Sequence, residues 1–140
     1  MKIGSLAAAR PAYYDRNATA LSGYYQNNFQ AGGDTNRISI TIAAGKKAIV
    51  ETASITVRRT SAAAPVGLVW DYLSVNDGTN NVLFMSGFLN NNTVDTFDRA
   101  LLPAQFTLYA GHILQGNTSD ASTGGAAWHH LVIKGTIFDA

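Results

Sequence analysis

Cysteine is absent from this chain of 140 residues, and charged residues make up only 14% of it. Without cysteine, the protein has no disulfide framework, no thiolate metal site and no cysteine nucleophile. Ten Lys and Arg are balanced by nine Asp and Glu, which leaves a formal net charge of +1. That balance gives no broad basic surface for nucleic acid or for an anionic membrane, so we expect neither as a partner.

Long hydrophobic runs are also absent. No apolar stretch approaches the ~20 residues that a helix needs to cross a bilayer. The first ten residues loosely imitate a signal peptide, but their apolar stretch is weak and ends at Arg10. We therefore expect a protein that is made in the cytoplasm and is not targeted elsewhere.

Hydrophobic residues nevertheless make up 46% of the chain, which excludes a disordered protein. A chain of this mass buries about two thirds of its unfolded surface, enough for one core without covalent staples. From Arg37 onward, apolar and polar residues alternate with a period of two, which is typical of half-buried strands. The clearest such segments are residues 38–42, 49–58 and 128–138, and the pattern over 49–58 predicts a bulge near Glu51.

Turn signals separate these segments at intervals of about ten to twelve residues. Asn76-Asp77-Gly78 predicts a tight hairpin, and residues 115–125 are polar enough to predict a loop. Residues 66–75 are apolar on both faces, which predicts a strand that is covered on both sides or faces another subunit. The sequence thus predicts an all-β fold, a jelly-roll-like β-sandwich of about eight strands over residues 37–140.

Residues 1–36 differ in composition from the rest of the chain. They contain no Val and one Ile, yet they hold four of the six tyrosines. Such a segment has too few core residues to fold alone, so we expect an extended N-terminal arm that packs on another surface, with packing on its own domain as the alternative. Tyrosine is enriched at interfaces, and the residues expected to contact a partner are Tyr13, Tyr14, Arg16, Tyr24, Tyr25 and Phe29.

Chemistry-bearing residues are few and poorly matched to one another. The adjacent His129 and His130 point to opposite faces of a strand, so with His112 they do not form a metal site. Asp95 and Asp98 flank Phe97, a pattern more typical of a solvated turn or an ion pair between subunits than of acid–base catalysis. We expect no catalytic residues, no metal and no cofactor, and we expect that the protein is not an enzyme.

Several stretches together carry a resemblance to a known class of proteins. They are residues 10–17 (RPAYYDRN), 43–48 (AAGKKA), 110–116 (AGHILQG), 120–125 (DASTGG) and the final 136–140 (TIFDA). This set resembles small virion structural proteins of tailed bacteriophages. The resemblance implies a β-sandwich particle component located in the virion, such as a capsid decoration (cement) protein, with a fibre or tail adaptor as the alternative.

Two hypotheses about partners follow. The surplus apolar face of residues 66–75 predicts self-association, and the resemblance implies a homotrimer. The expected partner is the major capsid protein or another virion protein, with the arm tying the body to the capsid. The alternative is a host-binding knob or adaptor module that uses the loops at 76–81, 90–92 and 115–125.

Overall fold

The computed structural model describes residues 17–29, 32–61, 68–90, 93–121 and 125–140. Tyr13, Tyr14 and Arg16, which we expect to contact a partner, lie outside the described residues. Every regular element in the described ranges is a β-strand. No helix that is long and apolar enough to cross a bilayer occurs within those ranges.

Nine strands follow one another along the chain. They are β1 (Thr19–Phe29), β2 (Gly32–Thr41), β3 (Lys46–Ser61), β4 (Val69–Asn76), β5 (Asn81–Leu89), β6 (Phe97–Leu101), β7 (Phe106–Tyr109), β8 (Ile113–Asp120) and β9 (Ala126–Asp139). All the pairings between them are antiparallel.

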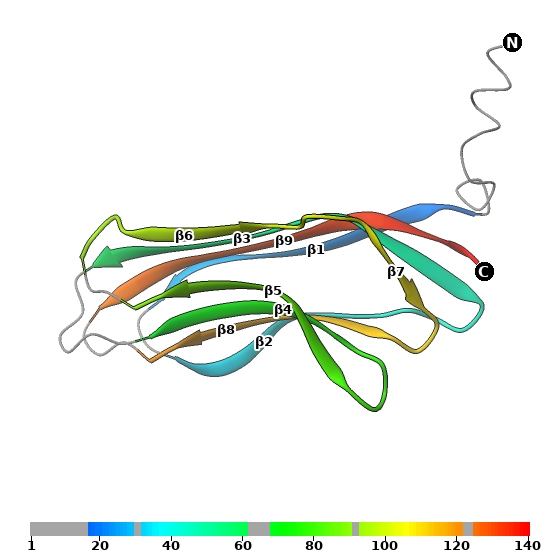
Figure 1. Ribbon diagram of the computed structural model, residues 1–140, viewed down its shortest axis with the longest axis horizontal. Coiled ribbons are helices and arrows are strands. Elements are labelled where there is room, and N and C mark those ends of the chain that lie inside the picture. Colours follow the sequence, from blue (N-terminus) through cyan, green and yellow to red (C-terminus); the bar gives the residue numbers. More distant parts are fainter. Residues whose placement is uncertain (1–16, 30–31, 62–67, 91–92, 122–124) are drawn as a thin grey trace, which may run out of the picture.

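The strands form two stacked sheets (Figure 1). One sheet has the order β1-β9-β3-β6, with β7 also paired to β3, and the other has the order β2-β8-β4-β5. This is the strand order of an eight-stranded jelly roll in which one strand is divided into β6 and β7. The predicted fold class and the approximate number of strands are confirmed.

The predicted arm over residues 1–36 requires a correction. Strand β1 pairs with β9 along its whole length, from Thr19 opposite Ile137 to Phe29 opposite Ala127, and the expected boundary at 36 falls inside β2. The inward side of β1 carries Leu21 and Gly23 in place of β-branched residues. A Cβ at Gly23 would lie 2.9 Å from Ile38, so the glycine allows the two sheets to meet closely at this edge.

The polar loop expected over residues 115–125 also requires a correction, because strand β8 extends to Asp120. Its residues alternate between half-buried and buried, and the buried positions are Leu114, Gly116, Thr118 and Asp120. Ile38 and Leu73 fill the space above Gly116. The strand is polar in sequence because its inward side faces a polar part of the interior.

Local features of the sandwich agree with the sequence pattern. The register of β3 against β9 shifts between Val50 and Thr52, which confirms the predicted bulge near Glu51. The β4–β5 hairpin turns at Asn76–Gly78, where the Asp77 N–H donates to the Asn80 carbonyl over 3.0 Å. Gly78 has φ +95°, a conformation that favours glycine. The predicted hairpin is therefore confirmed.

Candidate functional site

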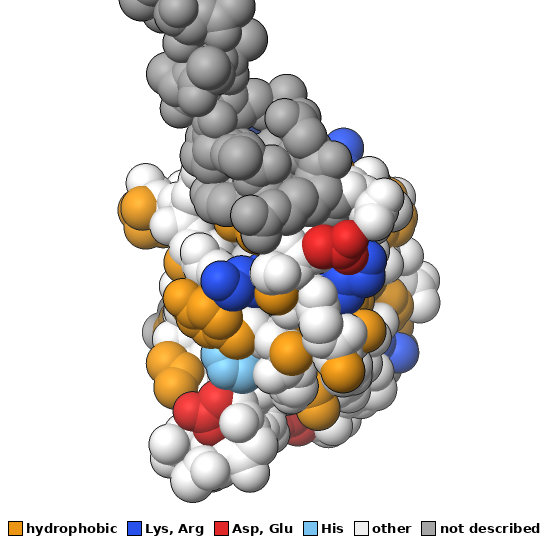
Figure 2. All heavy atoms as spheres, turned by 90° about the vertical axis from the view of Figure 1, so that its right-hand side faces the viewer, with side chains coloured by type: hydrophobic (Ala, Val, Ile, Leu, Met, Phe, Trp, Pro, Cys, Tyr) orange, Lys and Arg blue, Asp and Glu red, His pale blue; other side chains and the backbone are white. Residues whose placement is uncertain are grey.

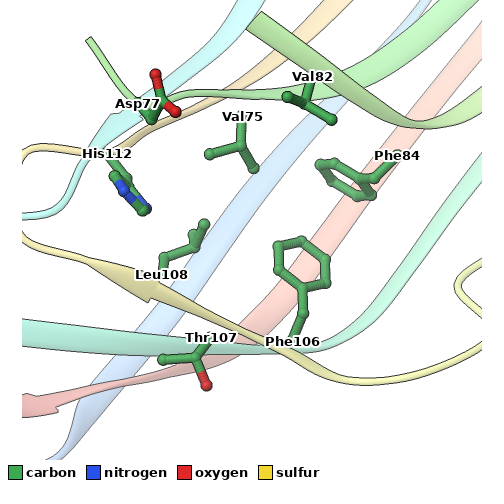
Figure 3. A pocket seen from close by; sticks show the side chains of 8 residues that line it. All are labelled: Val75, Asp77, Val82, Phe84, Phe106, Thr107, Leu108 and His112. Atoms are coloured by element: carbon green, nitrogen blue, oxygen red, sulfur yellow. The ribbon is translucent and has the colours of Figure 1, made fainter. Parts of the chain in front are cut away.

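A pocket of about 250 Å³ opens where the β4–β5 hairpin faces β7 (Figure 3). Apolar side chains from both sheets line its interior, and Asp77 and His112 lie at its polar side. The lining residues are Val75, Asp77, Val82, Phe84, Phe106, Thr107, Leu108 and His112. The pocket lies at the end of the molecule shown in Figure 2, where hydrophobic side chains gather around a histidine.

A β-bulge in β5 builds one wall of this pocket. Leu73 lies opposite Met85 and Ser74 lies opposite Leu83, so Phe84 has no partner residue on β4. A bulge re-aims the side chain that it leaves unpaired. The Phe84 ring meets the Phe106 ring edge-on, with 4.8 Å between the centroids, and this contact links the two sheets.

Hydrogen bonds to the backbone determine which polar atoms of the pocket can donate and which can accept. The Tyr109 N–H donates to Nδ1 of His112 over 3.1 Å, so Nδ1 is an acceptor and the Nε2–H of the neutral ring is a donor. Backbone N–H groups of Asn80 and Thr79 hold the pKa of the Asp77 carboxyl below its usual range, and His112 contributes in the same direction. The pocket thus offers an apolar interior beside one carboxylate and one imidazole, a combination that suits an amphipathic side chain.

Apolar residues also cover part of the outer face of the β2-β8-β4-β5 sheet. Trp70 lies opposite Phe88 in the sheet, and their exposed fractions are 37% and 47%. We call this surface the tryptophan face, and it comprises the exposed side chains of Leu68, Trp70, Leu83 and Phe88. Tyr72 lies beside Trp70 but is itself buried. The Trp70 and Tyr72 rings lie 4.7 Å apart at 36°. Large apolar side chains exposed together on one sheet face are typical of an interaction site.

Tyr72 fixes one side of the tryptophan face through two polar neighbours. Its hydroxyl donates to Oδ2 of Asp34 over 2.7 Å, and Asn117 Nδ2 donates to the Tyr72 oxygen over 3.1 Å. Burial and the hydrogen bond to Asp34 raise the pKa of Tyr72 to about 12. The tyrosine therefore stays neutral at physiological pH, and because it is only 7% exposed it supports the Trp70 ring and adds little exposed surface.

The outer face of the other sheet carries a row of three rings. His130 lies between Tyr24 and Trp128, with centroid distances of 5.5 Å and 6.4 Å and edge-on geometry in both contacts. Tyr24 is 60% exposed, whereas His130 and Trp128 are half-buried. Because the rings meet edge-on, the row is an irregular aromatic surface instead of a flat stacking platform.

Between the two sheets, away from the pocket, the interior contains charged groups. His129 is fully buried, and its Nδ1 lies 2.8 Å from both carboxylate oxygens of Asp71. On the other side of the ring, His129 Nε2 lies 3.8 Å from Oδ2 of Asp120. Arg59 is also fully buried. The Phe29 ring stacks on His129, with a centroid distance of 4.2 Å and an interplanar angle of 8°.

The electrostatics of this buried cluster favour the protonated forms. Burial raises the pKa of Asp71. The hydrogen bond to His129 acts in the opposite direction but does not cancel the effect of burial, so the pKa of Asp71 stays above its ordinary value. Burial lowers the pKa of His129, but the Asp120 and Asp71 carboxyls more than compensate, so the His129 pKa is above its ordinary value. All three side chains are sealed inside the sandwich. We therefore assign the cluster to the stability of the fold and not to chemistry on a substrate.

Comparisons with known proteins add only distant structural likeness. No protein-family model matches the sequence, and no curated protein is significantly similar to it. A chain in the structure of infectious bursal disease virus Gx strain is 10% identical, with a TM-score of 0.41 over 89% of this chain. Eiger TNF from S. frugiperda is 10% identical, with a TM-score of 0.38 over 86% of this chain and 93% of that chain.

A second viral chain, from infectious bursal disease virus Gt strain, is 10% identical, with a TM-score of 0.39 over 88% of this chain. This protein spans only about a third of the length of the two viral chains, 32% and 33%.

The described residues among the expected partner contacts have different environments. Tyr24 is exposed on the outer face of its sheet, whereas Tyr25 and Phe29 are half-buried on the inward side of β1. The Arg37 guanidinium lies over both inward rings, 4.8 Å from the Tyr25 centroid and 5.1 Å from the Phe29 centroid. Tyr25 and Phe29 therefore close the edge between β1 and β2, whereas Tyr24 is exposed.

The chemistry-bearing candidates do not converge. His112 lines the pocket, His129 is buried and His130 is on the outer face. Asp98 accepts from the Phe88 N–H at 2.9 Å, so it caps the exposed edge of β5. Asp95 lies in the turn before β6 with φ +68°. Within the described ranges, no group of His, Asp or Glu is arranged to hold a metal ion.

Sequence reasoning missed the pocket and the buried cluster. For the pocket, a signal exists, since Val75 and Val82 flank the predicted hairpin turn and Phe84 follows on the same strand. For the cluster, no such signal exists. Asp71 and His129 are 58 residues apart in the sequence. The residues around each of them contain no pattern that predicts their contact.

Proposed function

We propose that this protein is a structural component of a virus particle. More specifically, we propose a capsid decoration protein of a tailed bacteriophage, which assembles with copies of itself and docks on the major capsid protein. Two lines of support are the sequence resemblance to small phage virion proteins and the jelly-roll body with apolar residues on its surface. The protein works through the free energy of docking, and it catalyses nothing.

The observation that carries this proposal is the tryptophan face. In a two-sheet sandwich, each sheet buries one face, and the other face is usually polar. Here Trp70 and Phe88 share the outer face with Leu68 and Leu83, all of which are at least 37% exposed. We propose that a second copy of the chain covers this face, in a closed ring of three subunits, because closed cyclic symmetry is the usual way to bury such a surface.

Light scattering of the purified full chain tests self-association. We expect a trimer at micromolar concentration and a monomer after Trp70→Lys, because a charge at the centre of an apolar contact removes about 2 kcal/mol or more of binding free energy. The control is Phe97→Lys on the other sheet, where Phe97 is also large and exposed. A wild-type monomer, or a trimer that tolerates Trp70→Lys, contradicts the assignment of this face.

Particles with and without the protein test the decoration role. Particles stripped of the protein are expected to release their genome at a lower temperature than decorated ones. Adding back the wild-type chain restores the difference without divalent metal, whereas the Trp70→Lys variant restores less, because docking in threes raises the effective concentration of each contact. Equal release temperatures for stripped and decorated particles rule out a stabilising role.

The alternative function is a host-binding module, favoured by the row of Tyr24, His130 and Trp128. Amphipathic rings of this kind give a contact surface that is partly apolar and partly polar. On this alternative, stripped particles open at the same temperature as decorated ones but fail to adsorb to cells. Replacement of Trp128 and Tyr24 by Ser then abolishes adsorption and leaves particle stability unchanged.

A further inference from the structure

We infer that the free edge of strand β1 pairs with the β1 edge of a second copy of this chain, in antiparallel orientation about a two-fold axis. The two copies then share one continuous sheet. This contact goes beyond the proposed function, because it is separate from the tryptophan face. On a particle it would join one ring of three subunits to the next.

Strand β1 has one hydrogen-bonded side and one free side. It is the first strand in the order β1-β9-β3-β6, and within the described residues β9 is the strand that pairs with it (Figure 1). Alternate residues of an edge strand turn their N–H and C=O groups away from the sheet, where these groups can pair with another strand. The register of β1 against β9 runs without a shift over eleven residues. The free side of β1 is therefore a long and regular row of donors and acceptors.

The other edge strands carry features that oppose such pairing. β2 contains Asp34 and Arg37, and its register against β8 shifts twice. β6 has only five residues, among them Asp98 and Arg99, and β7 has only four. β5 has a bulge, and its Phe88 N–H donates to Asp98 over 2.9 Å. Charges, bulges and short lengths are the usual means by which edge strands avoid other strands.

None of these features occurs in β1. Its sequence, TALSGYYQNNF, contains no charged residue and no proline. The alternate side chains on its outer face, from Ala20 to Asn28, are all exposed. Among the strands that the structure describes, β1 is the one edge that is long, uncharged and free of bulges. An edge of this kind is a template for a further strand.

The composition of β1 favours a second copy as its partner. A two-fold axis between identical strands brings each charge close to its own copy, and like charges directly opposite one another are destabilising. Because β1 carries no charge, self-pairing incurs no such repulsion. The register that uses all eleven residues places Tyr24 opposite its own copy and Thr19 opposite Phe29. An aromatic residue opposite a β-branched residue is a favourable cross-strand pair.

Two further contacts follow from this register. Gly23 lies opposite Tyr25 of the second copy, and an aromatic ring across from an edge glycine covers the backbone that the glycine leaves bare. On the outer face, Tyr24 is the 60% exposed end of the row that continues through His130 to Trp128. The rows of the two copies meet at the axis, so the contact buries aromatic surface and also pairs backbone groups.

Pairing along a single edge is a small contact. We expect it to be weak between isolated subunits and to operate where a particle holds them close together, at high effective concentration. Light scattering at micromolar concentration then reports the tryptophan face alone. The edge contact requires a method that traps it.

Engineered disulfides trap the contact in the full chain, whose natural sequence has no cysteine. One batch carries Ser22→Cys and a second carries Gln26→Cys, both at exposed positions. In the inferred register, these two positions lie directly opposite each other with a Cα separation of about 5 Å, which a disulfide can bridge. After the batches are mixed at high concentration and mildly oxidised, we expect covalent dimers that join position 22 to position 26, identified by mass spectrometry.

Each batch oxidised alone is the matched control. In the inferred register, position 22 is displaced by four residues from position 22 of the second copy, which is about 14 Å along the strand. The same displacement separates the two copies of position 26, and a disulfide cannot bridge it. We expect at least about tenfold less covalent dimer from either batch alone. Cross-links 22–22 or 26–26 in amounts equal to 22–26 overturn the inference.

A charge at the two-fold axis gives a second comparison. Tyr24→Lys in both batches places two ammonium groups opposite each other, so the yield of the 22–26 dimer is expected to fall about fivefold. Tyr24→Lys in one batch with Tyr24→Glu in the other restores the yield, because the two charges then attract. Tyr109→Lys, at an exposed tyrosine on β7, leaves the yield unchanged. Equal yields from like and opposite charges at position 24 overturn the inference.

The Trp70→Lys chain separates this contact from the proposed function. The tryptophan face belongs to the β2-β8-β4-β5 sheet, whereas β1 belongs to the other sheet. The 22–26 dimer is therefore expected in the Trp70→Lys background as well, whether or not a ring of three forms. A trimer in light scattering that gives no 22–26 dimer keeps the proposed function and overturns the edge contact. A 22–26 dimer from a chain that is a monomer in light scattering keeps the edge contact and contradicts the role of the tryptophan face.

Discussion

The two ends of the sandwich interior differ in kind although the same strands build both. Toward the pocket, β9 and β4 contribute Ile133 and Leu73, and the interior is apolar. Toward the other end, the same strands contribute His129 and Asp71, which lie 2.8 Å apart in full burial. Along β4, the apolar Leu73 is only two residues from Asp71, and along β9, Ile133 is only four residues from His129. The interior therefore changes from apolar to ionic over a short distance.

This difference assigns the two ends different roles. The apolar end opens into a pocket that is lined mainly by apolar side chains and can accommodate another apolar group. The ionic end is sealed, with the Phe29 ring stacked on His129 and Arg37 lying over Phe29. Buried ionic groups contribute little net stability compared with apolar packing, but they are costly to unpair. They penalise alternative registers in which the partners would not meet, so we propose that the ionic end fixes the register of the sandwich.

The largest effect is expected from Asp71→Asn, which removes the carboxylate beside His129 without changing the size of the side chain. Removing one partner of a buried ion pair costs about 3–5 kcal/mol of unfolding free energy. Chemical denaturation of the full chain measures it. Asp95→Asn is the matched control, since Asp95 is exposed and asparagine tolerates its positive φ. A loss of unfolding free energy below about 1 kcal/mol for Asp71→Asn would show that Asp71 and His129 do not form a charged pair in the folded protein.

The next effect is a dependence of stability on pH. The pKa of His129 is above its ordinary value in the folded protein, so its contribution is fully present below about pH 6.5 and is lost as the pH rises through the folded pKa. The pKa of Asp71 is also raised, and its contribution likewise disappears as the pH rises above its ordinary value. The unfolding free energy is therefore expected to fall on going from pH 6 to alkaline pH, by at most about 1.4 kcal/mol per pH unit for one proton.

The groups in contact with His129 include Asp71 on β4, Asp120 on β8 and the Phe29 ring on β1. Arg59 is a further charged residue buried in the sandwich. His129→Gln removes the pH dependence above pH 6.5, whereas His130→Gln, on the outer face, keeps it. Denaturation curves at several pH values give the comparison. A wild-type slope that survives His129→Gln assigns the dependence to another group.

The smallest effect is expected at the apolar end. Ile133 is fully buried on β9, and Ile133→Val removes one methyl group at a cost of about 0.5–1.5 kcal/mol. Because Ile133 belongs to the cluster of buried apolar residues, the cost should be the same at pH 6 and at alkaline pH. A cost that changes with pH would show that the influence of the ionic cluster extends along the whole interior.

These two ends also explain what the sequence can and cannot predict. Where the interior is apolar, alternation identifies the strands, and the bulge near Glu51 and the hairpin at Asn76–Gly78 are confirmed. At the ionic end, β8 buries Thr118 and Asp120, so the strand has the composition of a loop. Period-two patterning depends on apolar residues facing inward, and a polar interior removes that signal.

The sequence does not predict strand β1, for a different reason. Its inward positions are Leu21, Gly23, Tyr25 and two further residues at the open edge of the sheet. Glycine allows close approach of Ile38, and Tyr25 is covered by Arg37 from β2. Neither property is visible as alternation of hydrophobicity, so the segment looks like an arm. The pocket depends on a bulge at Phe84 that only the pairing of β4 with β5 defines.

An electron cryomicroscopy map of the intact particle tests the central proposal most directly. We predict jelly-roll density repeated over the outer surface of the capsid, in groups of three, with the outer face of the β2-β8-β4-β5 sheet turned toward a second copy. Density confined to the tip of a fibre or tail, with the tryptophan face exposed to solvent, would contradict the decoration role and support the host-binding alternative.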